Sequence, residues 1–218
     1  MIRLELATLF TSLLPSSIFT AEIIGESPLP ALQPAEAEAL GRAGSKRLRD
    51  FTKGRACARR ALFAFGFEAT PVLIGHDGAP LWPRGFVGSI THCQGYCVAA
   101  VGREAEFQAL GVDAEPLAAL PPGVLDLVAS PSERSWLRGQ EGSPFSWDRI
   151  LFSAKESAFK AGARVLGQPL PFNEIEIVFD RNAGAFEANL SAVRRVPRLQ
   201  GRFRVASGLI ATTVVIPA

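Results

Sequence analysis

FSAKESAFK, residues 152–160, lies in the middle of a segment that the sequence predicts as one long helix, residues 147–166. Gly167 follows it, and glycine commonly ends a helix because it adopts the left-handed conformation without strain. Glu156 and Lys160 are four positions apart and therefore share one face of this helix. They form either an ordinary surface ion pair, which contributes little to stability, or a functional pair. In a functional pair, Glu156 is a metal ligand or a base and Lys160 neutralises phosphate charge.

A second stretch, GVDAEP at residues 111–116, carries two more carboxylates. Residues 110–114 are predicted as a strand, and side chains two positions apart on a strand point to the same face. Asp113 and Glu115 can therefore reach one ion together, although two solvated acids at a strand end are the commoner outcome for such a pair. With Glu156 they give three carboxylates near lysines. This set suits a hard divalent cation held against a phosphate ester.

GSITH, residues 88–92, is predicted as a glycine-opened, hydroxyl-rich turn that leads through Gly95 into an apolar strand at residues 96–101. Backbone N–H groups and hydroxyls in such a turn can donate hydrogen bonds to a phosphate. The alternative is that His92 is an ordinary histidine near a strand, satisfied by its neighbours. The sequence leaves both interpretations open.

The other strong helix prediction covers residues 45–65, with Ser45 as its N-cap and Gly66 as its C-cap. Arg47 and Arg55 are eight positions apart, so they lie on broadly the same side of this helix. Guanidinium groups donate two parallel hydrogen bonds and suit a terminal phosphate. The alternatives are the solvated polar face of an amphipathic helix and a nucleic-acid-binding surface.

The composition is that of an ordinary globular protein of 218 residues, with 48% hydrophobic and 20% charged residues. A net charge of +2 and the lack of an interleaved aromatic platform in the basic helix argue against a nucleic-acid-binding module. Three cysteines without a Cys-x-x-Cys pair favour a reduced, cytoplasmic protein, and with only two histidines a zinc site is not expected. No apolar run is long enough to span a membrane.

The remaining elements are predicted from apolar periodicity and turn residues. For residues 1–21 we expect a strand and loop rather than a secretion signal, because Glu5 and Pro15 interrupt the apolar stretch. The other predicted elements are a helix at 35–43, a turn-rich loop at 76–85, mostly helical structure at 121–142, and strands at 71–74, 175–179, 185–190 and, with a break at Ser207-Gly208, 201–216.

The two halves of the chain resemble each other weakly. Each contains a long helix ending in glycine, then a strand and a turn, then a strand of small residues opened by glycine, at residues 95–101 and 208–214. A duplicated α+β unit would explain this pattern and would place a site between the halves. Chance similarity between two apolar strands explains it nearly as well.

Five pieces of the chain follow one another in the order found in a known enzyme family. They are residues 47–62 (RLRDFTKGRACARRAL), 78–83 (GAPLWP), 88–92 (GSITH), 111–115 (GVDAE) and 152–160 (FSAKESAFK). Together they resemble the 4′-phosphopantetheinyl transferases, in particular the Sfp-type enzymes and their branch associated with siderophore and polyketide synthesis. The resemblance implies an α+β monomer of two pseudo-symmetric halves, residues 1–108 and 109–218, with the active site in the cleft between them.

The resemblance also implies the site residues. Asp113, Glu115 and Glu156 would be the ligands of Mg²⁺, and Glu156, Lys160 and His92 would be the catalytic groups. Coenzyme A, the substrate, would be contacted by Arg47, Arg55, Gly75, His76, Asp77, Thr91, His92, Asp113, Glu156 and Lys160.

Three departures from the family pattern stand out. Phe152 replaces a common tryptophan, and Thr91 replaces a common serine while keeping the hydroxyl. A lysine that some members carry in the nucleotide loop is absent between Leu73 and Pro80.

The activity that the resemblance implies is Mg²⁺-dependent transfer of the 4′-phosphopantetheine arm of coenzyme A to a serine of an apo acyl or peptidyl carrier protein, with release of 3′,5′-ADP. A non-catalytic binder of coenzyme A or of carrier proteins is the alternative, and the intact set of three acids argues against it. Residues 121–142, with Leu125, Val128 and Trp136, are the candidate docking element for the carrier, although these residues could equally belong to the core.

Overall fold

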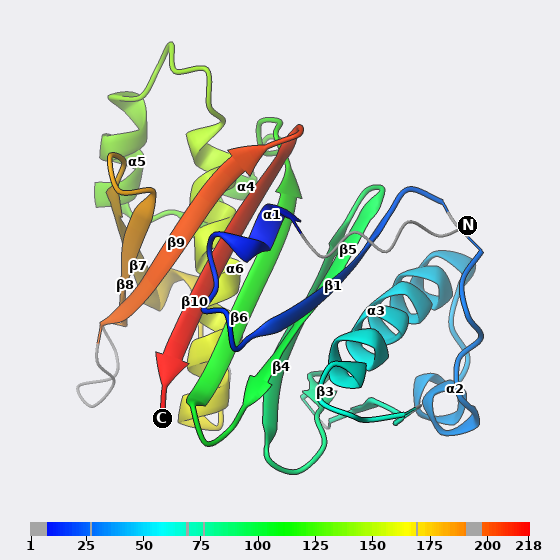
Figure 1. Cartoon of the computed structure of the whole chain (residues 1–218). Coiled ribbons are helices and arrows are strands. Elements are labelled where there is room, and N and C mark those ends of the chain that lie inside the picture. The colour runs from blue at the N-terminus through cyan, green and yellow to red at the C-terminus, as the bar shows by residue number, and fades with distance from the viewer. Residues whose placement is uncertain (1–7, 27, 69, 76, 169, 191–197) are drawn as a thin grey trace.

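Two antiparallel sheets, each packed against one long helix, make up most of the molecule (Figure 1). The computed structural model describes residues 8–26, 28–68, 70–75, 77–168, 170–190 and 198–218. The first sheet has the strand order β1-β5-β4, and the helix α3 packs against β5 and β1. These elements are β1 (Phe19–Ile24), α3 (Ser45–Phe63), β4 (Phe86–Cys93) and β5 (Tyr96–Arg103).

The second sheet has the strand order β6-β10-β9-β8-β7, and the helix α6 packs across β6 and β10. Every neighbouring pair of its strands is antiparallel. These elements are β6 (Phe107–Pro116), α6 (Trp147–Leu166), β7 (Ile175–Asp180), β8 (Ala185–Leu190), β9 (Leu199–Ala206) and β10 (Leu209–Pro217).

Short elements connect these larger ones. They are α1 (Thr8–Thr11), α2 (Pro34–Leu40), the paired strands β2 (Leu73–Ile74) and β3 (Pro80–Leu81), α4 (Val124–Val128), α5 (Pro131–Arg138) and the 3-10 helix η1 (Phe172–Glu174). Among the helices in the described part of the chain, none has both the length and the apolar character needed to cross a membrane.

The same order of elements occurs twice along the chain. In the first half a strand (β1) is followed by a short helix, the long helix α3, a small hairpin (β2–β3) and a larger hairpin (β4–β5). In the second half β6 is followed by α4 and α5, the long helix α6, the hairpin β7–β8 and the hairpin β9–β10. The last strand lies between the other two in both cases, giving β1-β5-β4 and β6-β10-β9. The similar sequences at 95–101 and 208–214 fall on these two middle strands, which supports a duplicated α+β unit.

The long helices agree with their predictions, with corrections at the ends of α3. The helix α6 covers residues 147–166, and Gly167 ends it in the left-handed conformation, as predicted. At the start of α3, Gly44 rather than Ser45 is the N-cap. The C-cap is Ala64 rather than Gly66, which adopts a positive φ two residues later. The predicted helix at 35–43 is α2, which ends earlier because Gly41 turns to a φ of 62°.

The GSITH stretch was predicted as a turn, and this is wrong: it lies within strand β4. Its residues alternate between the two faces of the strand, so that Ser89 and Thr91 are buried. Their hydroxyls bond to β6, where Val112 N donates to Ser89 Oγ over 3.1 Å and Ala114 N donates to Thr91 Oγ1 over 3.4 Å. A hydroxyl-rich strand is therefore stable here because the neighbouring strand satisfies its polar side chains.

The other strand predictions hold in position, with differences in length. Strand β6 begins and ends beyond the predicted 110–114, and the predicted strand at 71–74 is reduced to β2. The loop expected at 76–85 contains β3, which pairs with β2. The hairpin β7–β8 and the break between β9 and β10 lie where they were predicted, as do the helices expected within 121–142.

In the described part of the N-terminal stretch, the expected strand is wrong from residue 8, where the short helix α1 stands. Leu9, Phe10 and Leu13 pack into the core with β4, β5 and β6, and strand β1 begins only at Phe19. The apolar character of Leu9, Phe10 and Leu13 is thus explained by burial.

Helix α6 approaches β6 very closely, and Gly111 makes this possible. A Cβ atom added at Gly111 would lie 1.9 Å from the backbone oxygen of Ser157, where no side chain fits. On the helix, the buried face near the strand is lined by small residues, including Ala154, Ala158 and Ala161. Three basic residues of α6, Arg149, Lys160 and Arg164, are therefore held within hydrogen-bonding distance of β6.

A buried ion pair attaches α5 to α6. The Lys155 ammonium lies 2.8 Å from Glu133 Oε2 and donates to the carbonyl of Phe172 over 3.1 Å. Glu133 also accepts from the backbone N–H of Ile177 over 2.8 Å and closes a capping box with Ser130 at the start of α5. Both charged side chains are almost completely buried, so each depends on the other for compensation of its charge.

Candidate active site

Polar side chains of strand β6 and helix α6 face each other at similar spacings along the two elements. Two residues along a strand advance about 6.6 Å, and four residues along a helix advance about 6 Å. Asp113 accordingly meets Ser153, and two residues further on Glu115 meets Arg149, four residues earlier on the helix. Asp113 and Glu115 therefore share one face of β6, as their spacing predicted.

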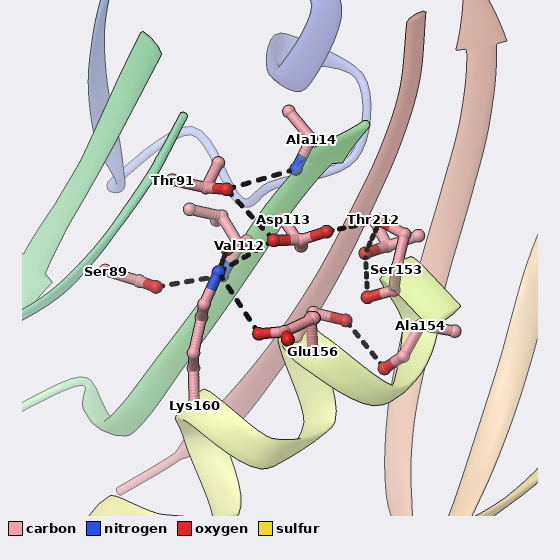
Figure 2. Close-up of polar contacts among 11 residues, drawn as sticks. Ser89, Thr91, Val112, Asp113, Ala114, Ser153, Ala154, Glu156, Lys160 and Thr212 are labelled. Carbon is pink, nitrogen blue, oxygen red and sulfur yellow. Dashed lines mark hydrogen bonds and ion pairs between the residues drawn. The ribbon is translucent and has the colours of Figure 1, made fainter. Parts of the chain in front are cut away.

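Asp113 lies at the centre of this contact and is almost completely buried (Figure 2). Its Oδ1 accepts from Thr91 Oγ1 on β4 over 2.9 Å and from Lys160 Nζ on α6 over 2.7 Å. Its Oδ2 accepts from Ser153 Oγ over 2.8 Å. One carboxylate thus receives donors from both halves of the molecule.

The Lys160 ammonium lies among oxygen atoms from both elements. Besides Asp113, it donates to the backbone oxygen of Val112 over 3.1 Å, and it lies 3.9 Å from Glu156 Oε2 (Figure 2). Glu156 and Lys160 do share one helix face. One positive charge here partly compensates two carboxylates.

The two glutamates of the site have raised pKa values. Burial is the main cause of the raised pKa of Glu156, and the charges of Asp113 and Glu115 add to it, while Lys160 opposes the shift. Burial and Asp113 likewise raise the pKa of Glu115, against the hydrogen bond and charge of Arg149. Negative charge therefore accumulates beyond what Lys160 and Arg149 balance, which favours binding of a cation.

Oxygen donors of this kind are the ligands that Mg²⁺ prefers. The predicted ligands Asp113, Glu115 and Glu156 all lie along the contact of β6 with α6, so the donor set fits the ion. Within the described ranges, however, no three His, Cys, Asp or Glu side chains are assembled as a ready metal site. Asp113 is paired with Lys160, and Glu115 is paired with Arg149.

Thr91 and His92 point to opposite faces of β4 and have different surroundings. Thr91 faces β6 and Asp113, as described above, and the neighbours of His92 include Lys46 and Asp50 at the start of α3. Partial burial lowers the pKa of His92, Lys46 and Lys160 add to this, and Asp50 and Asp113 oppose it.

Arg47 and Arg55, predicted to act together, differ in exposure. Arg47 is exposed, whereas Arg55 is buried with its guanidinium 4.1 Å from the centre of the Phe51 ring. Burial lowers the pKa of Arg55 to about 10, so it stays protonated at neutral pH. Its Nη2 donates to the carbonyl of Leu73 over 3.1 Å, and in the described part of the chain its Nε is the one buried side-chain nitrogen or oxygen without a partner.

The predicted nucleotide loop lies in the β2–β3 hairpin that Arg55 contacts. Gly75 N donates to Ala79 O over 2.8 Å, and Asp77 Oδ1 accepts from Ala79 N over 3.0 Å, which closes a tight turn. His76 lies outside the described residues.

Two of the residues expected to dock a carrier are partly buried and pack against the core. Leu125 packs against the main cluster of the second half. The Trp136 ring stacks on Phe179 with 5.2 Å between centroids and meets the Trp147 ring edge-on at 5.3 Å. The large apolar side chain that α4 exposes is Leu127.

Sequence reasoning missed the partners of the acidic residues. Arg149 pairs with Glu115 over 2.7 Å, and Ser153 lies 3.0 Å from the Thr212 hydroxyl on β10. These contacts join positions 34 and 59 residues apart, so local patterns did not indicate them. One available signal was the polar stripe on α6 at positions 149, 153, 156 and 160, which keeps to one helix face.

The fold and the site define an α+β protein of two like halves, with acids and a lysine gathered where the second half meets the first. Family models match both halves: a 4′-phosphopantetheinyl transferase N-terminal domain over residues 35–102, and the 4′-phosphopantetheinyl transferase superfamily over residues 109–206. The chain belongs to the 4′-phosphopantetheinyl transferase family of enzymes, which confirms the resemblance seen in its five sequence pieces.

Individual relatives agree with this assignment. The chain is 43% identical over 221 residues to 4′-phosphopantetheinyl transferase Svp of Streptomyces mobaraensis, covering 96% of this chain and 90% of the relative. It is 39% identical over 217 residues to 4′-phosphopantetheinyl transferase Npt of Nocardia iowensis, covering 93% and 97%. A shorter match, 39% identical over 125 residues, is to enterobactin synthase component D of Escherichia coli O157:H7, covering 56% of this chain and 58% of the relative.

Proposed function

We propose that this enzyme transfers the 4′-phosphopantetheine arm of coenzyme A to a serine of an apo acyl or peptidyl carrier protein and depends on Mg²⁺. The observation that carries the proposal is the surroundings of Asp113. The buried carboxylate of Asp113 accepts hydrogen bonds from Thr91 on one half and from Ser153 and Lys160 on the other. Two further acids with raised pKa values lie beside it.

In the proposed reaction the serine oxygen forms a bond to the phosphorus that bears the pantetheine arm. The bond from that phosphorus to the bridging oxygen of the pyrophosphate breaks, and its electron pair leaves with 3′,5′-ADP. Glu156 accepts the serine proton, directly or through water. Its raised pKa suits a base, and general-base help of this kind contributes about 10²–10⁴-fold to a rate.

Asp113, Glu115 and Glu156 would hold Mg²⁺, which when bound would offset negative charge on the pyrophosphate. Lys160 would stabilise the same charge from α6. Among the residues proposed to bind coenzyme A, the exposed Arg47 and the protonated Arg55 suit its ADP phosphates, since guanidinium groups pair well with phosphate. The others are Gly75, His76, Asp77, Thr91 and His92, with Asp113, Glu156 and Lys160.

Several further properties are part of the proposal. Residues 1–108 and 109–218 would be the two halves of a single functional unit that works as a monomer, with its active site in the cleft between them. Three free cysteines in the described chain are consistent with a reduced, cytoplasmic setting. The alternative remains a non-catalytic binder of coenzyme A or carrier proteins.

Intact-protein mass spectrometry of an apo carrier tests the proposal. Incubation with the enzyme, coenzyme A and Mg²⁺ should add the mass of one phosphopantetheine, and a chelator should prevent the gain. Asp113→Ala should abolish the gain without unfolding the protein, while Glu104→Gln, at an exposed ion pair with Arg164, should leave it unchanged. Full activity of Asp113→Ala would contradict the metal assignment, and no gain with peptide-synthetase, polyketide or fatty-acid carriers would favour the non-catalytic alternative.

A further inference from the structure

Arg149, in the first turn of α6, uses each of its three guanidinium nitrogens for a different acceptor. Its Nη1 donates to Glu115 Oε2 over 2.7 Å, its Nε to the carbonyl of Ala118 over 3.1 Å, and its Nη2 to the carbonyl of Ala119 over 2.8 Å. Both charged side chains are largely buried, with 15% and 17% of their surfaces exposed. A planar guanidinium bonded on three sides has little freedom to turn.

Further hydrogen bonds hold the segment that carries these acceptors. The carboxylate of Asp148, next to Arg149 on α6, accepts from the backbone N–H of Leu120 over 2.7 Å. Leu117 N donates to Gly208 O over 2.8 Å, which ties the end of β6 to the start of β10. Arg149 is therefore fixed relative to the backbone of β6 and the residues after it. The Glu115 carboxylate, which is hydrogen-bonded to Arg149, is fixed in the same way.

Glu115 is largely buried, and its hydrogen bond from Arg149 fixes the orientation of the carboxylate. The pair uses Oε2, and a carboxylate accepts on its other oxygen as well. Partners that hold a metal-binding carboxylate in this way typically change metal affinity by about 10–100-fold when they are removed.

We propose that Arg149 is a positioning residue for the metal site. By binding one oxygen of Glu115, it orients this carboxylate as a ligand alongside Asp113 and Glu156. The inference rests on the proposed function, because it takes Glu115 to be a metal ligand. It differs from a purely structural clamp, in which Arg149 would stabilise the segment after β6 whatever the side chain at position 115.

Binding of Mn²⁺ without coenzyme A, measured from the electron paramagnetic resonance signal of the free ion, tests the inference independently of transfer. Arg149→Gln and Glu115→Gln should each weaken Mn²⁺ binding by about 10–100-fold. In the double variant, binding should be no weaker than in Glu115→Gln alone, because Arg149 acts only through that carboxylate. Arg164→Gln is the matched control, since this arginine on the same helix pairs with the exposed Glu104, and it should bind Mn²⁺ as the wild type does.

Other results would overturn the inference, and they can be told apart from a failure of the proposed function. Unchanged or tighter Mn²⁺ binding by Arg149→Gln, or a full additional loss in the double variant, would overturn the positioning role. If Arg149→Gln does not fold, Arg149→Lys serves instead: a lysine lacks the planar guanidinium that spans Glu115 and the carbonyls of Ala118 and Ala119, so a loss of Mn²⁺ binding is expected here too. If Glu115→Gln binds Mn²⁺ normally and the wild type still modifies its carrier, this inference fails and the proposed function stands. A wild type that neither binds Mn²⁺ nor modifies any carrier overturns both.

Discussion

Ser153 is the residue through which β10 and α6 together hold Asp113. The Ser153 hydroxyl donates to Asp113 Oδ2. The Thr212 hydroxyl contacts the Ser153 hydroxyl and also donates to the Ser153 carbonyl. All three side chains are buried, so no bulk water replaces a lost bond. In the sequence Ser153 is one small residue in a helix rich in alanine, and nothing local marks it as a partner of an acid forty positions away.

The change Ser153→Ala should therefore weaken the site more than the fold. Asp113 loses the donor to one oxygen, but Thr212 keeps its bond to the Ser153 carbonyl. We expect a loss of about 10-fold in Mn²⁺ affinity, and a loss of about 1 kcal/mol in the free energy of unfolding. Mn²⁺ titration and chemical denaturation measure the two effects.

Ser157→Ala is a matched control for this prediction. Ser157 is equally buried on the same helix, but its hydroxyl donates to the Ala154 carbonyl and not to Asp113. It should leave Mn²⁺ affinity unchanged. Equal losses of affinity in the two variants would show that Ser153 acts through helix packing and not through Asp113.

At the scale of elements, the sequence predicted the helices better than the strands. The helix α6 was predicted to the residue because one apolar stripe and a terminal glycine define it locally. Strand β4 was misassigned at GSITH because its stability comes from β5 and β6, which satisfy its backbone and its hydroxyls across the fold. For the same reason the candidate acids could be named from sequence, while their pairing with Arg149 and Ser153 could not.

The contact between α6 and β6 should not tolerate a side chain at position 111. In Gly111→Ala the new Cβ would lie 1.9 Å from Ser157 O and 2.9 Å from Ser157 C, so the helix or the strand must move. Backbone atoms yield less easily than side chains, and we expect a loss of about 3 kcal/mol in the free energy of unfolding. Transfer activity should fall as well, because Lys160 and Asp113 lie on the two elements that separate. Urea denaturation and the carrier mass assay check both effects.

Gly44→Ala is the control for the glycine prediction. Gly44 precedes α3 with a φ of −65°, which alanine adopts freely, and a Cβ there would meet nothing within 4 Å. A small effect on stability, of a few tenths of a kcal/mol, is expected from the weaker N-cap. If Gly111→Ala is no more destabilised than Gly44→Ala, the close approach of α6 to β6 does not exist in solution.

At the scale of the whole molecule, the two repeated halves meet along β4 and β6 (Figure 1). The strands do not continue one sheet. Instead, side-chain hydroxyls of Ser89 and Thr91 accept hydrogen bonds from the backbone N–H groups of Val112 and Ala114. Because Thr91 also donates to Asp113, the junction of the halves and the centre of the site share one side chain.

The backbone of β6 should lose protection when these hydroxyls are removed. In Ser89→Ala with Thr91→Val, the buried N–H groups of Val112 and Ala114 have no acceptor on β4, at a cost of about 1–3 kcal/mol each. Amide hydrogen exchange followed by NMR should show these two amides exchanging faster, by more than the slowest amides of the hairpin β7–β8. That difference matters because a loss of global stability alone accelerates all globally protected amides equally.

Thr91→Ser with Ser89 intact provides the comparison, because it keeps both hydroxyls and should preserve the protection of Val112 and Ala114. The β7–β8 amides lie at the far edge of the second sheet, away from the contact of β4 with β6, and serve as the reference in every variant. If the β6 amides and the β7–β8 amides change by the same factor in the double variant, the hydroxyls stabilise the protein as a whole but do not join its halves. If only the β6 amides change, the two α+β units are held together at the same strand that carries Asp113. Any movement of one half against the other then necessarily moves the donors of that carboxylate.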